Sequence, residues 1–150
     1  MKPTWSVILL TTLIGAGQGL FLALATLQIY ALVGLLPPAE GHALVVAGSA
    51  AAFVLLAAGL LASFFHLGRP ERAWRTAAKW RTSWLSREVI ALPAFMAAVA
   101  LYGLLYATQW NPVLVSTARG VAIDAALVVA VAGSVLAFVL FLCTGMIYAA

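Results

Sequence analysis

Apolar residues dominate four long stretches of the chain, at about residues 5–36, 43–65, 86–108 and 121–148. About 20 helical residues cross the ~30 Å hydrocarbon layer of a membrane, and each stretch reaches that length. Two prolines at 37–38 follow the first stretch, and Pro93 lies inside the third, where a kink is expected. The pattern therefore predicts an all-α fold, a polytopic bundle of four transmembrane helices that forms one membrane domain over residues 1–150.

Composition supports a membrane protein and excludes several other classes. The chain is 65% hydrophobic and only 8% charged, whereas soluble domains carry roughly a quarter charged residues. A soluble enzyme, a nucleic-acid-binding protein and a disordered tail are therefore excluded. The single cysteine, Cys143, is interpreted as a packing residue, and no cysteine and histidine cluster has metal-ligand spacing.

Positive charge is concentrated in one loop. Six of the eight Lys and Arg residues lie between positions 69 and 87, Lys2 lies near the N-terminus, and Arg119 lies on the opposite side. Because basic residues are retained on the cytoplasmic side, the N-terminus and loop 66–88 are predicted to be cytoplasmic. Gly68 and Pro70 are typical of a helix end and a helix start, so a short basic helix on the membrane surface is expected within 66–85.

His66 and Glu88 begin and end this loop and are the candidate proton-transfer groups. A histidine exchanges protons near neutral pH. Glu88 has three alternative roles: stabilisation of the first turn of a helix capped by Ser86, an ion pair with Arg87 or Arg81, or proton transfer at the membrane edge. The arginines either set the topology through lipid phosphates or dock an acidic partner surface.

Haem ligation by two histidines is excluded by their spacing. His42 and His66 stand at opposite ends of the second stretch, about 36 Å apart along a helix, so they cannot bind one iron. His42 is interpreted as a solvated loop histidine, and Asp124 as a charge at a helix N-terminus. No redox centre is therefore expected in this chain.

Polar and small residues within the first stretch predict helix contacts. Gly15, Gly19 and Ala23 recur every four residues, which predicts a close helix–helix contact along this stripe. Gln18 and Gln28 are expected to form interhelical hydrogen bonds, with the lining of a pocket for a lipid-like ligand as the alternative.

Two motifs resemble those of a known family. The runs His-Leu-Gly-Arg-Pro at 66–70 and Trp-Leu-Ser-Arg-Glu at 84–88 are similar to the DMSO reductase anchor subunit family, with further similarity at 11–17 and 143–148. Such anchors have about eight helices, so this chain resembles an N-terminal half. The last apolar stretch reaches the end of the sequence without a polar flank, and we therefore expect a piece of a longer protein.

The resemblance implies a subunit without substrate catalysis of its own, which holds a molybdopterin catalytic subunit and an iron–sulfur subunit at the bacterial inner membrane. It implies electron exchange with ubiquinone or menaquinone, and neither haem nor metal in this chain. His66 and Glu88 are expected at the quinone site. The resemblance also implies second-rank residues that shape that site or dock the iron–sulfur subunit, namely Gly68, Arg69, Arg72, Arg75, Arg81 and Arg87.

The basic loop makes the chain more similar to the family branch that anchors cytoplasm-facing sulfite dehydrogenases, with electrons passing from sulfite to quinone. The alternatives are a quinol-oxidising anchor of a DMSO, S-oxide or N-oxide reductase, a passive structural anchor, and a transporter. A transporter is disfavoured, because an inverted repeat with broken helices would give Pro93 a counterpart in the first pair of stretches.

Overall fold

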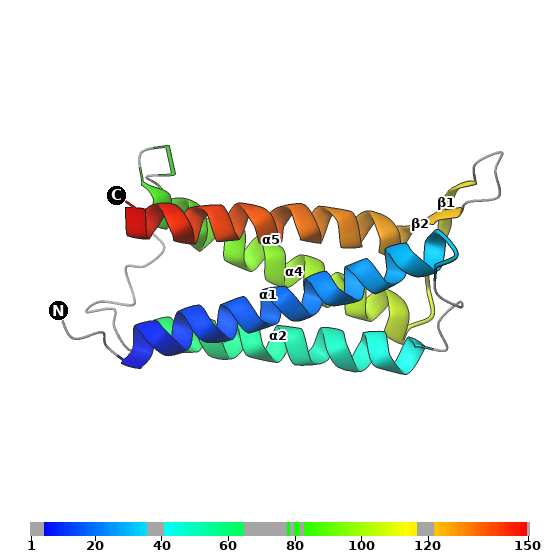
Figure 1. Cartoon of the computed structure of the whole chain (residues 1–150), viewed down its shortest axis with the longest axis horizontal. Helices are drawn as coiled ribbons and strands as arrows, with labels where there is room; N and C mark the ends of the chain where they lie inside the picture. Colours follow the sequence, from blue (N-terminus) through cyan, green and yellow to red (C-terminus); the bar gives the residue numbers. More distant parts are fainter. Residues whose placement is uncertain are drawn as a thin grey trace.

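The computed structural model describes residues 5–35, 41–64, 78, 80–81, 83–116 and 122–149. Within these ranges, a two-stranded hairpin precedes the last of four helices (Figure 1). The elements in chain order are α1 (Trp5–Leu32), α2 (His42–Phe64), α4 (Trp84–Ala107), β1 (Val113–Ser116), β2 (Ala122–Asp124) and α5 (Ala125–Ala149). Each helix is long and apolar enough to cross a membrane, which confirms the all-α bundle of four spans. The basic helix expected within 66–85 falls largely on residues outside these ranges.

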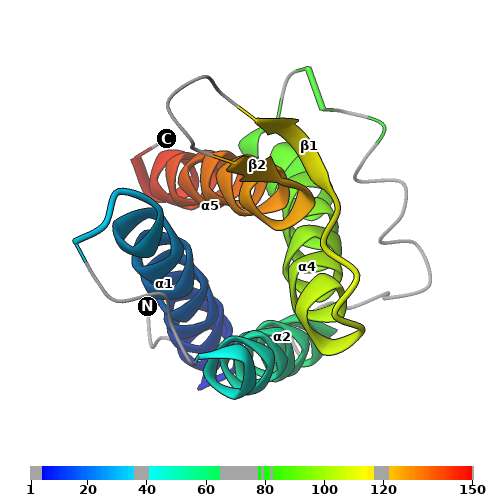
Figure 2. The same cartoon turned by 90° about the vertical axis from the view of Figure 1, so that its right-hand side faces the viewer.

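The four helices form a ring in the order α1, α2, α4, α5, so that α5 lies next to α1 (Figure 2). Successive helices run in opposite directions (Figure 1). The starts of α1 and α4 and the ends of α2 and α5 therefore share one end of the bundle, called here the Glu88 end. The β hairpin lies at the other end, called the hairpin end.

Helix α1 ends at Leu32, before the position near residue 36 that the proline pair suggested. Gly34 has φ +75°, in the left-handed region that favours glycine. The Leu35 N–H donates to the Tyr30 carbonyl at 2.9 Å, and the Gly34 N–H donates to the Ala31 carbonyl at 3.2 Å. These two bonds form a Schellman motif, so a glycine cap ends the helix and the prolines only follow it.

Helix α5 begins at Ala125, because residues 122–124 form β2 and not the first turn expected from 121. Strand β2 pairs antiparallel with β1. The side-chain oxygens of Asp124 and Asn111 accept from the N–H groups of Leu127 at 2.8 Å and Ala126 at 2.9 Å. Asp124 therefore caps the start of α5, which confirms its predicted place at a helix N-terminus.

Helix α4 begins at Trp84, so Ser83 precedes it and the prediction of Ser86 as the cap is wrong. Ser86 lies within the helix, 1% exposed, and its hydroxyl has no hydrogen-bond partner among the residues that the structure describes. Glu88 falls beyond the first helical turn. Its role therefore has to be sought in what its side chain contacts.

The other helix boundaries lie close to the predicted ones. Helix α2 covers His42–Phe64, where residues 43–65 were expected, and α4 ends at Ala107, where residue 108 was expected.

Helix α1 approaches α2 closely at Gly17 and not along the predicted stripe. A Cβ atom on Gly15 or Gly19 would meet no atom within 4 Å, and Ala23 is exposed. A Cβ on Gly17 would lie 2.9 Å from Leu56 Cγ. The stripe prediction is therefore wrong for the part of the chain that the structure describes, since the four-residue spacing defined a face but not its direction.

Phe21 fills the middle of the bundle and has no exposed surface. Its ring packs edge-on against Phe95 at 5.3 Å and Tyr102 at 5.5 Å between centroids. Gly133 on α5 makes room for this ring, because an added Cβ would lie 2.5 Å from Phe21 Cζ. Nearer the Glu88 end, Cys143 is 2% exposed, which confirms it as a packing residue.

Candidate functional site

The structure places three of the eight predicted site residues: Arg81, Arg87 and Glu88. The other five lie outside the described residues; they are His66, Gly68, Arg69, Arg72 and Arg75. The site is therefore built from Glu88 and the side chains that surround it.

Arg87 forms hydrogen bonds to the segment that precedes α4. Its Nε donates to the Trp80 carbonyl at 3.0 Å, and its Nη2 donates to the Arg81 carbonyl at 3.2 Å. Its guanidinium carbon lies 4.2 Å from the centroid of the Trp84 ring, which is cation–π distance. Arg81 is exposed, with its guanidinium carbon 5.2 Å from the Trp80 ring. Among the described residues, neither arginine forms an ion pair with Glu88.

Glu88 instead contacts helix α5. The Thr144 hydroxyl donates to Glu88 Oε1 at 3.0 Å, across 56 residues of sequence. The Glu88 side chain is half-buried, and it belongs to a helix that is long and apolar enough to cross a membrane. Carboxyl groups at membrane depth are costly, and those that persist face the bundle interior and mark functional sites. Glu88 is therefore the strongest candidate for chemistry in the described part of the chain.

Glu88 lines a small pocket between three helices. Its volume is about 90 Å³, with walls from α1, α4 and α5, namely Leu10, Thr11, Ile14, Gly15, Gln18, Glu88, Phe141 and Thr144. Pockets that enclose a whole small molecule measure roughly 300–1,000 Å³. This pocket therefore accepts the edge of a larger ligand that reaches in from outside, or a few water molecules.

Gln18 forms the α1 side of this pocket. It is 3% exposed, and its Nε2 donates to the Ala137 carbonyl of α5 at 3.2 Å, which confirms the predicted interhelical bond. Its lining of the pocket also agrees with the alternative interpretation. Thr144 was missed by the sequence analysis, because nothing along the sequence connects position 144 to position 88.

A second polar group lies towards the hairpin end, beyond Phe21. The Tyr102 hydroxyl donates to Gln28 Oε1 at 2.9 Å, and the Tyr102 and Tyr106 rings lie 5.2 Å apart. The His42 ring lies 6.2 Å from that of Tyr106. Gln28 therefore forms the predicted interhelical bond, and His42 is exposed but is the first residue of α2 and not a loop residue.

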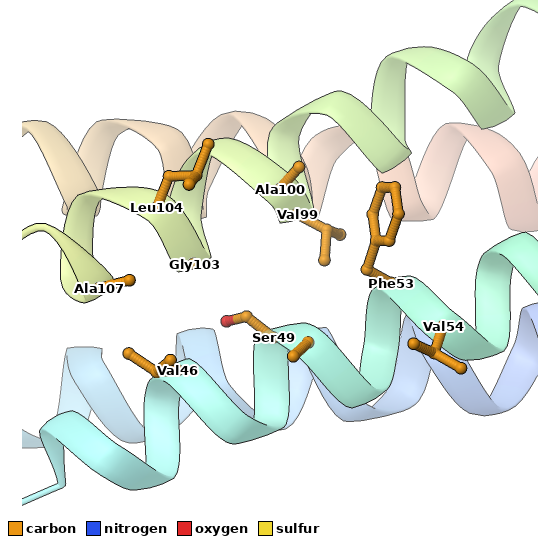
Figure 3. A pocket seen from close by; sticks show the side chains of 10 residues that line it. Val46, Ser49, Phe53, Val54, Val99, Ala100, Gly103, Leu104 and Ala107 are labelled. Atoms are coloured by element: carbon orange, nitrogen blue, oxygen red, sulfur yellow. The ribbon is translucent and has the colours of Figure 1, made fainter.

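A larger groove between α2 and α4 is apolar (Figure 3). It measures about 400 Å³, and the hydroxyl of its lining residue Ser49 already donates to the Val45 carbonyl at 2.7 Å. The other lining residues are Val46, Ala50, Phe53, Val54, Val99, Ala100, Gly103, Leu104 and Ala107. The groove lining offers no group for proton transfer, so the Glu88 pocket remains the candidate site.

No metal site is found in the part of the chain that the structure describes. Those residues contain no group of three or more His, Cys, Asp or Glu side chains that could hold a metal ion. The chemistry available at the Glu88 pocket is therefore hydrogen bonding and proton transfer by a carboxyl group, two hydroxyls and an amide.

Comparisons with known proteins identify the family. The family model of the DMSO reductase anchor subunit (DmsC) matches residues 1–148. A sulfite dehydrogenase subunit of Allochromatium vinosum is 54% identical over 150 residues, which are 100% of this chain and 46% of that protein. The chain thus spans about half the length of this relative. No solved structure matches the chain. Because the family match covers almost every residue, this chain belongs to the DMSO reductase anchor subunit family.

Proposed function

We propose that this chain forms the quinone-reactive part of the membrane anchor of a molybdopterin and iron–sulfur oxidoreductase, and that sulfite is the electron donor. Family membership supports the anchor role. The name of the 54% identical relative, a subunit of sulfite dehydrogenase, supports sulfite. The observation that carries the quinone site is the Glu88 carboxyl group, which lines a pocket inside an apolar bundle.

The proposed reaction balances with groups supplied by the complex. Oxidation of sulfite with one water in the catalytic subunit yields sulfate, two protons and two electrons. The electrons pass to the membrane through the iron–sulfur clusters of a second subunit. A quinone takes up the two electrons and two protons and leaves as quinol. Glu88 donates a proton to a quinone oxygen and regains it from the water at the Glu88 end, and His66 serves as the second proton donor.

The Glu88 end is assigned to the cytoplasmic face of the bacterial inner membrane. The positive-inside count supports this orientation, since seven of the eight Lys and Arg residues precede α1 or lie between positions 69 and 87. The antiparallel helix order agrees, because the starts of α1 and α4 share one end. We propose that Gly68 and five arginines dock the iron–sulfur subunit or shape the quinone site. These arginines are Arg69, Arg72, Arg75, Arg81 and Arg87.

The test uses membranes that contain the complete complex. Sulfite-dependent reduction of a short-chain ubiquinone analogue is measured beside sulfite-dependent reduction of ferricyanide, an artificial acceptor that bypasses the quinone site. We expect His66→Ala to lose quinone reduction and keep ferricyanide reduction. His42→Ala is the matched control, because His42 lies at the hairpin end, and it is expected to keep both activities.

Three results would overturn parts of this proposal. A wild-type complex that reduces ferricyanide but no quinone would make the chain a passive anchor. A complex without sulfite activity that reduces DMSO with quinol would reverse the direction of electron flow and replace the substrate. Equal loss of quinone reduction in the His66 and His42 variants would remove His66 from the site.

A further inference from the structure

The Glu88 pocket contains a second buried polar group whose hydrogen-bonding capacity is only partly used. Gln18 is 3% exposed, and one amide N–H donates to the Ala137 carbonyl. Within the described ranges, no hydrogen bond is formed by the second N–H or by Oε1 of this side chain. Polar groups in an apolar interior are favourable only when they are hydrogen-bonded, so the unused N–H and oxygen of Gln18, a lining residue of the pocket, are available to a ligand there.

The two hydroxyls of the pocket are already committed as donors. Thr144 donates to Glu88 at 3.0 Å, and Thr11 donates to the Val7 carbonyl at 3.1 Å. Among the described residues of the pocket, the second N–H of Gln18 is therefore the uncharged donor that is still available to a ligand carbonyl. Gln18 Oε1 is an acceptor beside it.

This pair of groups suits a ligand that changes from acceptor to donor during the reaction. A quinone oxygen accepts hydrogen bonds, whereas the corresponding quinol hydroxyl also donates one. A primary amide can match both states, because its N–H donates to the carbonyl and its oxygen accepts from the hydroxyl. A hydroxyl group already bound to a backbone carbonyl, as in Thr11, cannot donate to the quinone without breaking that bond.

One wall of the pocket reaches the outer surface of the described bundle. Phe141, one of its lining residues, is 41% exposed on α5. The ring of a membrane quinone can therefore reach the polar end from the hydrocarbon layer while its tail stays in lipid. The small pocket volume requires that only the oxygen-bearing edge of the ring is enclosed.

We propose that Gln18 contacts the quinone head group directly, so that the oxygen-bearing edge of the ring lies between Gln18 on α1 and Glu88 on α4. Thr144 of α5 positions the Glu88 carboxyl group through its hydrogen bond. This inference rests on the proposed quinone reaction and adds α1 to the site.

The test compares Gln18→Met with Gln28→Met in membranes that contain the complete complex. Methionine has nearly the volume of glutamine but neither donates nor accepts strong hydrogen bonds. Gln28 is a matched control, because it lies on the same helix and also bonds another helix, but at the hairpin side of Phe21. We expect Gln18→Met to raise the KM for the quinone analogue about three- to tenfold, with ferricyanide reduction unchanged, as for one lost hydrogen bond. Gln28→Met should change that KM less than about twofold.

The outcomes separate this inference from the proposed function. If wild type reduces quinone, Glu88→Gln does not, and Gln18→Met behaves like Gln28→Met, the role of Gln18 is refuted and the quinone site stands. If wild type reduces only ferricyanide, both proposals fall together. Should Gln18→Met not assemble, photolabelling of wild type with an azidoquinone decides the matter. Labelling of an α1 peptide that contains Gln18 supports the contact, and labelling confined to other segments overturns it.

Discussion

Gly17 is a point of close approach between α1 and α2, and replacing it with alanine tests the helix packing. The added Cβ would lie 2.9 Å from Leu56 Cγ and 3.0 Å from the Ala52 carbonyl oxygen. Leu56 is fully buried, and the oxygen belongs to the backbone of α2, so neither can turn away. Relief would therefore require the two helices to separate.

The expected size of this effect follows from two opposing terms. Carbon atoms prefer separations of about 3.5–4.0 Å, so the helices would have to move apart by about 0.5 Å. Overpacking of this kind costs roughly 1–3 kcal/mol, whereas alanine is favoured over glycine in a helix by up to about 1 kcal/mol. We therefore expect Gly17→Ala to lower the free energy of unfolding by roughly 1–2 kcal/mol.

The assay is unfolding of the full-length protein in mixed micelles by SDS titration, followed by circular dichroism of the helices. Gly15→Ala and Gly19→Ala are the controls, because an added Cβ at either position meets no atom within 4 Å. These two variants should be neutral or slightly stabilising. The packing described here would be refuted if Gly17→Ala were tolerated as well as they are, or if either control were as damaging as Gly17→Ala.

Three further substitutions are measured by the same titration. Asp124→Ala removes the cap that accepts from the Leu127 N–H, so a loss of about 1 kcal/mol is expected, and an unchanged midpoint would argue against the cap. Gly34→Ala forces a left-handed φ of +75° on alanine, so a loss of about 1 kcal/mol is expected and a gain would contradict that cap. Gly133→Ala places a Cβ 2.5 Å from Phe21 Cζ and should cost about 1–3 kcal/mol. Adding Phe21→Leu should recover part of this loss, and strict additivity in the double-mutant cycle would exclude the contact.

The four helices could be predicted from the sequence because the membrane sets both their length and their apolar character. Their ends could be placed only to within about four residues, since backbone hydrogen bonds at particular residues decide them. Gly34 ends α1 before the prolines are reached. Because β1 pairs with β2, α5 begins only at Ala125. The two strands are too short for a strand pattern in the sequence to predict them.

The direction in which each helix face points was less predictable. In a soluble helix, polar residues mark the outer face, but in these spans the outer face is as apolar as the core. The sequence therefore could not distinguish Gly15 and Gly19, where an added Cβ would meet no atom within 4 Å, from Gly17, which packs against α2. The same uniformity concealed that Gln18 belongs to the interior beside Glu88.

Glu88 itself could be selected from the sequence, because a carboxyl group at the edge of an apolar span is uncommon and needs a reason. Its surroundings could not, since they depend on how the ring of helices closes. Thr144 reaches Glu88 only because α5 packs beside α4, and Gln18 lines the same pocket only because α1 lies next to α5 (Figure 2).

The most direct test of the account is the replacement of Glu88 by glutamine in the complete complex. Glutamine keeps the size of the side chain and an oxygen that can accept from Thr144, but it cannot transfer a proton at neutral pH. We expect sulfite-dependent reduction of the ubiquinone analogue to fall by about 10²-fold or more, while reduction of ferricyanide and the amount of membrane-bound complex stay at wild-type levels. Quinone reduction at the wild-type rate in the Glu88→Gln complex would contradict the assignment of Glu88 as the proton donor.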